Sequence, residues 1–295
     1  MQLSVLVENT TLIDRYYRGE PALSFFIEDG DTKILFDCGY SDIFLQNAEA
    51  MGINLLETDT IVLSHGHIDH TGGLPHLTAY HIRASSDKKR ITRPVFLTHP
   101  ATFTQKTAAE GVPVGCPLSP EYLRRFGEVT LTDKPLLITP RLLFLGEIPR
   151  YYPDRIQKSS AYIESPEGPK PDPVIEDSCL VYRSDRGLVL ICGCTHAGIE
   201  NTVRHARHIC GDERIAAIIG GLHLYQADSA RIREVAAWCA QSGVGDIYPC
   251  HCTGMPAAIA LQQNHILTPI GVGTRLCWDS GEITDGQTLN FRHYE

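Results

Sequence analysis

The feature that most constrains this chain is a run of three histidines and one aspartate in six residues, His65-Gly66-His67-Ile68-Asp69-His70, which directly follows an apolar segment at 60–64. Placing so many polar side chains at the end of a buried strand costs several kcal/mol unless each is hydrogen-bonded or bound to a metal. Imidazole nitrogens and carboxylate oxygens are the ligands that zinc takes when a site must stay open for catalysis. The run therefore predicts a metal site; the alternative is a surface loop that is rich in histidine by chance.

The spacing within the run divides the ligands between two ions. His65 and His67 alternate along an extended loop and can face one metal, while Asp69 and His70 can turn to a second. A dinuclear site is therefore expected where the strand at 60–64 ends.

Hydrophobic periodicity and turn residues predict the same plan in both halves of the chain, hairpin strands followed by alternating strands and helices. In the first half, strands are expected at 3–7, 23–28, 33–36, 60–64 and 94–98, with a helix from an N-cap at Ser41 to Gly52 and another from near Pro75. In the second half, strands are expected at 178–183, 187–191, 215–219 and 246–249, with helices at 199–209, 229–240 and from Pro256. The repeated plan predicts an α/β fold in which two sheets stack face to face with helices outside, as a single domain over 1–295.

Residues 102–173 interrupt this plan. They are rich in Pro, Gly and charge, and the stretch at 164–173 holds prolines that neither a helix interior nor a central strand accepts. An irregular insertion over the site, or a connector between the halves, is expected here.

Charge and cysteine usage limit the partners and the compartment. Lys plus Arg number 26 against 35 Asp plus Glu, a net charge of −9, which opposes nonspecific binding to nucleic acid or anionic membrane. The sequence shows neither a secretion signal nor an apolar run near the roughly 20 residues of a membrane span, so a cytoplasmic protein with reduced thiols is expected. The basic residues Arg83, Lys88, Lys89, Arg90 and Arg93 are expected to form a solvated loop, with an anion-binding role as the alternative.

Three further motifs follow predicted strands of the second half. Cys194 and His196 follow 187–191, His223 follows 215–219, and the segment Cys250-His251-Cys252 follows 246–249. Each motif places a histidine at the mouth of a sheet, where ligands converge.

The His-x-His-x-Asp-His run and these later motifs resemble the metallo-β-lactamase superfamily. The resemblance implies the four-layer αβ/βα sandwich, two mixed sheets with helices outside. It also implies that one metal is held by His65, His67 and His196, and the other by Asp69, His70 and His251. Many members have a bridging Asp where this chain has Gly193-Cys194, so either Cys194 binds metal or the bridge is missing.

Three other residues are candidates through the resemblance or their position. Asp37 is expected to accept hydrogen bonds that orient the histidine loop; a turn-forming Asp is the alternative. His223 is a reserve ligand or substrate contact, and His99, after the strand at 94–98, is a possible substrate contact. His76, His81, His205, His208 and His265 are expected to be surface or helix-face residues without function.

The resemblance implies a metal-dependent hydrolase acting on a small, anionic molecule. Two divalent ions are expected, zinc first, although imidazole and carboxylate also accept iron or manganese. They would lower the pKa of water from 15.7 toward about 7 and supply hydroxide, with Asp69 and His70 at the catalytic centre and Asp69 orienting the nucleophile. His67 argues against the oxygen-reducing diiron branch, which has Glu at that position.

Two alternatives remain open. A narrower resemblance, to the subgroup of dihydropterin-ribofuranosylaminobenzene-phosphate synthases, implies a pterin and a phosphate-bearing substrate joined through a carbon–nitrogen bond. It is carried by four segments: Val7-Glu8-Asn9-Thr10, Thr98-His99-Pro100, Gly193-Cys194-Thr195-His196-Ala197-Gly198 and His251-Cys252-Thr253-Gly254. A binding protein that keeps the fold without catalysis is the second alternative.

Overall fold

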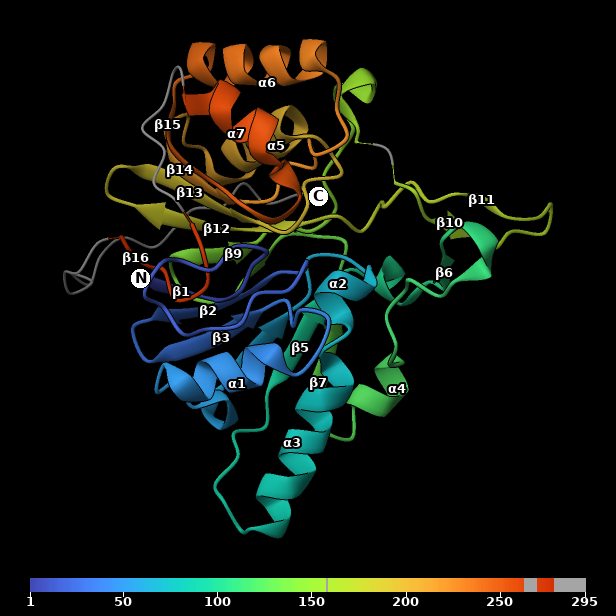
Figure 1. The fold of residues 1–295 in the computed structure, drawn as a ribbon, viewed down its shortest axis with the longest axis vertical. Coiled ribbons are helices and arrows are strands. Elements are labelled where there is room, and N and C mark those ends of the chain that lie inside the picture. The colour runs from blue at the N-terminus through green and yellow to red at the C-terminus, as the bar shows by residue number, and fades with distance from the viewer. Residues whose placement is uncertain (158, 263–269, 279–295) are drawn as a thin grey trace.

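The chain folds into two β-sheets that lie face to face with helices on their outer sides (Figure 1). The structure is a computed structural model that describes residues 1–157, 159–262 and 270–278. The architecture confirms the predicted α/β sandwich of two mixed sheets.

The first sheet has the strand order β16-β1-β2-β3-β4-β5-β7. Strands β1, β2 and β3 form the predicted antiparallel meander, and β3, β4, β5 and β7 run parallel. Helices α1 and α3 cover its outer face (Figure 1). The bounds are β1 Gln2–Val7, β2 Ser24–Asp29, β3 Thr32–Phe36, α1 Ile43–Ala50, β4 Thr60–Val62, α2 Ile68–Thr71, α3 Leu74–Ser86, β5 Val95–Thr98, β7 Glu128–Leu131 and β16 Arg275–Cys277.

The second sheet has the order β15-β14-β13-β12-β9-β8. The predicted hairpin β12–β13 is antiparallel, and β13, β14 and β15 are parallel. Helices α5, α6 and α7 cover its outer face (Figure 1). The bounds are β8 Leu136–Leu137, β9 Leu142–Phe144, β12 Cys179–Ser184, β13 Gly187–Cys192, α5 Ile199–Cys210, β14 Ile215–Gly220, α6 Ser229–Gln241, β15 Val244–Pro249 and α7 Met255–Gln262.

Apolar side chains from both sheets form the central core. Phe25 and Phe36 stack with ring centroids 6.2 Å apart on the first sheet, and Phe144, Tyr182 and Val189 pack opposite them from the second. Alternate residues on these strands therefore face inward, and burial of this apolar surface is the main favourable term in folding.

Two helix starts test the N-cap and proline signals expected from the sequence. The predicted N-cap Ser41 is wrong by one residue, because α1 has Asp42 at that position without a side-chain cap. The Ser41 hydroxyl donates to Glu20 Oε2 at 2.7 Å and also accepts from the N–H of Ile43, the first residue of α1, at 3.3 Å. The helix expected near Pro75 is α3, with this proline in its first turn, where its missing N–H costs nothing.

The segment 102–173 is not uniformly irregular. It supplies β7 to the first sheet and β8 and β9 to the second, which short strands and proline-rich flanks concealed in the sequence. The rest forms a small sheet of order β11-β10-β6 that projects to one side (Figure 1). Its elements are β6 Lys106–Thr107, α4 Pro120–Leu123, β10 Tyr162–Ile163 and β11 Lys170–Pro171. Short 3-10 helices lie at Leu55–Glu57, Pro100–Phe103, Ala109–Gly111, Pro153–Arg155 and His251–Thr253.

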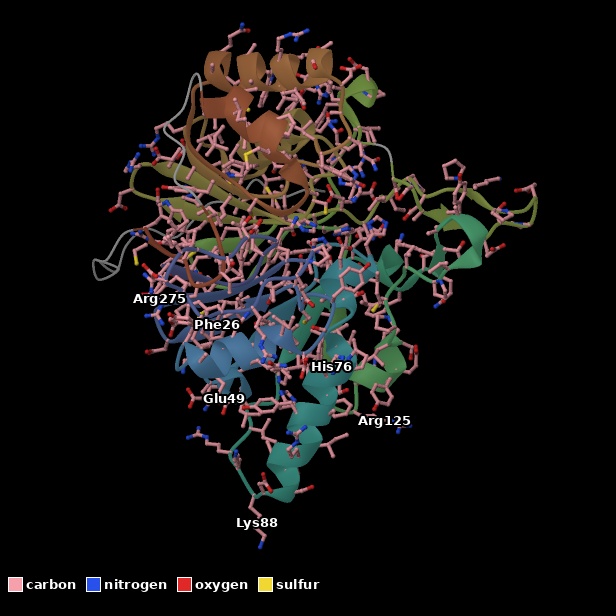
Figure 2. The ribbon with its side chains drawn as sticks, in the orientation of Figure 1. Phe26, Glu49, His76, Lys88, Arg125 and Arg275 are labelled. Carbon is pink, nitrogen blue, oxygen red and sulfur yellow. The ribbon has the colours of Figure 1, made fainter. Side chains whose placement is uncertain are left out.

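The surface features expected from the sequence are mostly as predicted. The basic residues at 83–93 are exposed, and Lys88 lies just beyond the far end of α3 (Figure 2). No helix in the described part of the chain combines the length and apolar character that a membrane crossing requires.

Candidate metal centre

The candidate ligands meet where strands of both sheets end. The loop that carries His65 and His67 follows β4, and His196 follows β13. His223 follows β14, and His251 follows β15. The carboxyl ends of neighbouring parallel strands lie at one edge of a sheet, so residues far apart in sequence converge there.

The first predicted ligand group is brought together. Nε2 of His65 lies 3.1 Å from Nδ1 of His67. The ring of His196 has its centroid 5.1 Å from that of His65 and 5.0 Å from that of His67. Two nitrogens bound to one tetrahedral zinc at about 2.0–2.1 Å are roughly 3.3 Å apart, so the spacing of His65 and His67 suits such an ion.

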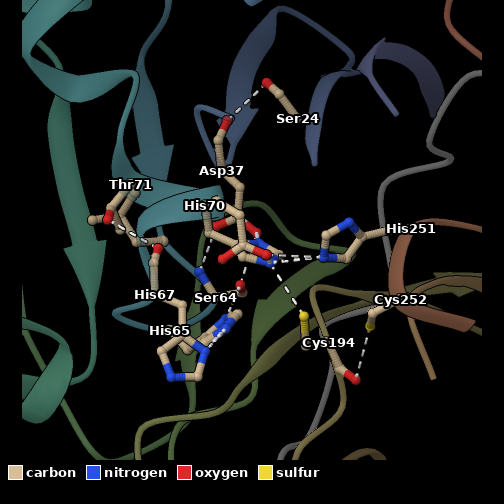
Figure 3. A network of polar contacts seen from close by, with 12 residues as sticks. Ser24, Asp37, Ser64, His65, His67, His70, Thr71, Cys194, His251 and Cys252 are labelled. Carbon is tan, nitrogen blue, oxygen red and sulfur yellow. Dashed lines mark hydrogen bonds and ion pairs between the residues drawn. The ribbon is translucent and has the colours of Figure 1, made fainter. Parts of the chain in front are cut away.

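The second predicted group is equally close. Nε2 of His70 and Nε2 of His251 lie 3.2 Å apart, and Oδ2 of Asp69 lies 3.5 Å from the first and 3.3 Å from the second. Figure 3 shows His70 and His251 pointing toward one another, with Cys194 below them. The arrangement offers two imidazoles and one carboxylate to a second ion.

Cys194 lies between these groups. Its Sγ is 3.2 Å from Nε2 of His70. The same atom lies within 4.8 Å of donor atoms of His65 and His196, and also within 4.8 Å of donor atoms of Asp69, His70 and His251. A thiol therefore stands where the resemblance to the metallo-β-lactamase superfamily leads us to expect a bridging Asp.

Asp37 and Ser64 orient two of the histidines from behind. Asp37 is fully buried, and its Oδ2 lies 2.7 Å from both Nδ1 of His70 and Oγ of Ser64. Nδ1 of His65 lies 2.9 Å from the Ser64 hydroxyl (Figure 3). Protons held on these Nδ1 atoms leave both Nε2 atoms with a lone pair for a metal.

A buried charged cluster orients His67. Nε2 of His67 lies 3.3 Å from Oδ2 of Asp172, which accepts from Nζ of Lys106 at 2.8 Å. Lys106 also pairs with Glu176 at 2.9 Å, and the backbone N–H of Gly66 donates to Glu176. Sequence reasoning missed these three charged residues because they lie in or just after the segment expected to be irregular.

Glu8 and Asn9 hold the loop of His251. Oε1 of Glu8 accepts from the N–H of His251 at 2.8 Å, and the Asn9 amide donates to the His251 carbonyl at 3.1 Å. Glu8 is 3% exposed at the end of β1. The residues after the first strand thus position a candidate ligand near the other end of the chain, and only pairing across the fold could reveal this contact.

Four residues at the site have left-handed backbone conformations. Their φ angles are 58° for Asp37, 57° for Thr195, 49° for His223 and 51° for His251. Such conformations cost of order 1–3 kcal/mol at non-glycine residues and concentrate at functional sites. The surrounding hydrogen bonds therefore hold these side chains in place against local preference.

The electrostatics differ between the two donor groups. Burial lowers the pKa of His70, but the carboxylates of Asp69 and Asp37 outweigh it and raise the pKa to about 9. Burial would raise the pKa of Asp69, yet His70 and His251 hold it below its usual value. In the first group, burial and the neighbouring histidines lower the pKa of His65 and of His196 well below the usual value, so positive charge is favoured only beside the carboxylates.

The unpaired ring nitrogens of His196 also indicate that the donor set fits a metal ion. His196 is 1% exposed, yet within the described structure neither ring nitrogen has a hydrogen-bond partner. Leaving such a polar group unpaired costs roughly 1–3 kcal/mol, which a metal bond would offset.

A cleft of about 480 Å³ opens over these groups. Its lining includes His67, Asp69, Cys194, His196 and His251. Around them lie the amide of Asn9, the hydroxyls of Ser159 and Ser160, and the exposed rings of Tyr40 and Tyr225. His223, in the loop after β14, and Cys252, in the loop after β15, also line the cleft.

The other histidines lie apart from the centre. Nδ1 of His99 accepts from the N–H of Ala101, Nε2 lies 3.3 Å from Glu147, and His99 does not line the cleft. His76 and His208 are exposed as expected, whereas His81 and His205 are buried, because their helices pack these faces inward. His265 lies outside the described residues.

Comparison with known proteins identifies the family. The sequence model of the Metallo-beta-lactamase superfamily matches residues 17–209. A relative from Methanocaldococcus jannaschii, 30% identical over 270 residues that cover 87% of this chain and 89% of the relative, is named 7,8-dihydropterin-6-methyl-4-(beta-D-ribofuranosyl)-aminobenzene-5'-phosphate synthase.

Solved structures agree on the fold. Tm1679, a metal-dependent hydrolase of the beta-lactamase superfamily, superposes with a TM-score of 0.79 at 24% identity, covering 95% of this chain and 100% of that one. Zn(2+)-bound PqqB from Methylobacterium extorquens superposes with a TM-score of 0.54 at 10% identity, covering 94% and 100%. The sequence match, the relative and the shared fold lead to one conclusion: this chain belongs to the metallo-beta-lactamase superfamily.

Proposed function

We propose that this protein is a metal-dependent hydrolase with a dinuclear site, acting on a small anionic molecule. The observation that carries the proposal is the pair of adjacent donor groups, one of three imidazoles and one of two imidazoles and a carboxylate; His67, His196, Asp69 and His251 of these groups line the cleft. His65, His67 and His196 would hold one ion, and Asp69, His70 and His251 the other. Divalent ions bound there would make hydroxide available near neutral pH and polarise the bond to be cleaved.

The side chains around the ions have distinct tasks. Asp69 is 25% exposed, and one of its oxygens lies against His70 and His251. The other oxygen can accept a hydrogen bond from a water in the cleft and so orient it. Asp37 keeps the His70 proton on Nδ1, which reserves Nε2 for binding.

The cleft suits a planar, oxygen-rich substrate. Tyr40 and Tyr225 are 43% and 50% exposed at its rim, where aromatic rings can stack on a flat heterocycle. Ser159, Ser160 and Asn9 offer hydrogen bonds. No Lys or Arg is among the described residues that line the cleft, so negative charge on a substrate would be met by the ions and these neutral donors.

The second candidate is a synthase that joins a pterin to a ribofuranosylaminobenzene phosphate. The 30% identical relative that bears this name supports it, and the resemblance spans 87% of the chain.

Metal content separates these enzymes from a binding protein without a dinuclear site. We expect about two ions per chain by elemental analysis, and fewer in His67→Ala and His251→Ala, while the exposed His76→Ala keeps the wild-type content. Protein that neither contains metal nor takes it up would contradict the proposal.

Product analysis separates hydrolase from synthase. Metal-loaded protein is incubated with phosphoesters, lactones and thioesters, and separately with a dihydropterin and the aminobenzene ribofuranosyl phosphate. Cleavage that is lost in Asp69→Asn supports the hydrolase. A coupled product detected by mass spectrometry, without cleavage of any ester, supports the synthase instead.

A further inference from the structure

A third group of donor atoms lies beside the metal centre and belongs to neither predicted ligand group. Sγ of Cys194, a ring nitrogen of His223 and Sγ of Cys252 lie within 4.8 Å of one another. All three residues line the cleft, so an ion there would keep a side open to solvent or substrate. We propose that Cys194, His223 and Cys252 form a third metal position that selects a thiophilic ion such as Zn²⁺ or Cd²⁺.

The chemistry of this group differs from that of the other two. Two sulfur atoms and one imidazole are a soft donor set, which thiophilic ions prefer, whereas carboxylate oxygen suits harder ions. Cys194 and Cys252 are only 2% and 9% exposed, so their thiolates would be shielded from water once bound.

The backbone holds the loops of His223 and Cys252 together. The N–H of Leu222 donates to the Thr253 hydroxyl at 3.0 Å, and the N–H of Tyr225 donates to the Cys252 carbonyl at 3.1 Å. His223 itself has a φ of 49°, a conformation that these contacts maintain. The donor atoms are therefore preorganised rather than carried on independent loops.

Gly221 makes room for the Cys252 thiol. A Cβ at this position would lie 2.4 Å from Sγ of Cys252 and 2.7 Å from the carbonyl oxygen of Gly193. The N–H of Gly221 also donates to that carbonyl at 2.9 Å, which ties the loop after β14 to the one that carries Cys194. Any larger residue would displace Cys252 from the group.

Cys194 joins this position to the second ion site. Its Sγ is 3.2 Å from Nε2 of His70, while Sγ of Cys252 lies 3.7 Å from the Cys194 carbonyl oxygen (Figure 3). A Cys194 thiolate can bridge two ions, so the third position extends the dinuclear site rather than replacing it. The proposal goes beyond the hydrolytic function, because it requires only the two thiols and His223.

Cadmium titration tests the third position. Full-length protein is stripped of metal, kept reduced with a phosphine, and titrated with Cd²⁺, while bound ions per chain and sulfur-to-cadmium charge-transfer absorption are followed. We expect three equivalents in the wild type. Cys252→Ser should bind one fewer and lose about half of the absorption, because one of two thiolates is removed. Cys277→Ser, which removes an exposed thiol, should match the wild type.

The outcomes separate this inference from the proposed function. Two equivalents in the wild type, or the same absorption in Cys252→Ser, would overturn the third position. A Cys194–Cys252 disulfide that leaves the oxidised and reduced proteins with equal metal content would also overturn it. In His67→Ala, charge-transfer absorption should persist even though the histidine sites are damaged, so either proposal can fail alone. Gly221→Ala, with thermal unfolding as a folding check, should reproduce the loss seen in Cys252→Ser.

Discussion

Buried oxygen atoms select which ring nitrogen each histidine of the first motif presents. Asp37 holds Nδ1 of His70, the Ser64 hydroxyl lies against Nδ1 of His65, and Asp172 lies against Nε2 of His67. His65 and His70 therefore present Nε2, whereas His67 presents Nδ1. Because His65 presents Nε2 and His67 presents Nδ1, the two rings can point toward one metal position although they lie on one short loop.

Replacing Asp172 tests whether its carboxylate orients the ring of His67. Asp172→Asn should weaken binding of one ion by roughly 10–100-fold, because the amide no longer holds the His67 proton with a charged acceptor. Competition with a chromophoric chelator measures the change. Asp154→Asn, at an exposed carboxylate of the same segment, should leave affinity unchanged. Equal affinities in both variants would show that Asp172 does not orient His67.

At the scale of elements, the small sheet is attached to the centre through buried charge. Lys106 on β6 and Asp172 just after β11 are 2% and 6% exposed, and Glu176 is 1% exposed. The burial of charge is tolerated because Lys106 pairs with both carboxylates. The projecting sheet is therefore part of the support of the site.

Removing the cation of this cluster should be strongly destabilising. Lys106→Met leaves two buried carboxylates without their cation, and we expect a loss of about 3–5 kcal/mol in the free energy of unfolding by urea denaturation. Adding Glu176→Gln removes one of the unpaired charges and should recover part of the loss. If Lys106→Met alone were as stable as the wild type, water would already reach the cluster.

Helix α5 makes a pH-dependent contribution to stability through His205. Burial, followed by the charge of His208, lowers the pKa of His205 to about 4, against about 6.5 in an unfolded chain. As pH falls, the unfolded state takes up this proton first, so stability is lost between about pH 6.5 and pH 4 and is unaffected above that window. At pH 5 the loss is about 2 kcal/mol.

A substitution isolates this contribution from other acid-sensitive groups. His205→Leu should lose about 2 kcal/mol less than the wild type when urea unfolding at pH 5 is compared with pH 7. His76→Leu, at an exposed position, should follow the wild type. Parallel pH profiles for His205→Leu and wild type would contradict a buried, neutral His205.

At the scale of the whole molecule, the centre joins the two halves of the sandwich. The first sheet supplies His65, His67, Asp69 and His70, and the second supplies His196 and His251. Glu8, which directly follows β1, adds a direct hydrogen bond from the first half of the chain to the loop of His251. An ion bound by both sheets would therefore stabilise the native state against unfolding.

Chelation should consequently lower global stability. Each ion that binds only the folded chain contributes about 4 kcal/mol when free metal is 1,000 times its dissociation constant. We expect the unfolding midpoint to fall after chelation and to recover when metal is restored. His251→Ala should show a smaller difference. A midpoint that chelator does not move would mean that the ions add nothing to the stability of the sandwich.

The first ligand motif was predictable from sequence because its residues are neighbours along the chain. The sandwich was predictable because its strands and helices carry clear periodicity. In contrast, β16 and the short strands of 102–173 were not predictable, since two to four residues give no periodic signal. Of the distant candidates, His196, His223 and His251 lie at the cleft and His99 does not, although all four follow strands.

The sequence by itself determined the types of donor, the family and the order of the strands and helices with clear periodicity, because these depend on residue identity and on local pattern. Only the tertiary structure decided that Lys106, Asp172 and Glu176 stand behind His67, that Glu8 holds His251, and that Cys252 and His223 meet at Cys194. Such contacts depend on how two sheets and a projecting segment pack, and no local pattern encodes distances between residues so far apart.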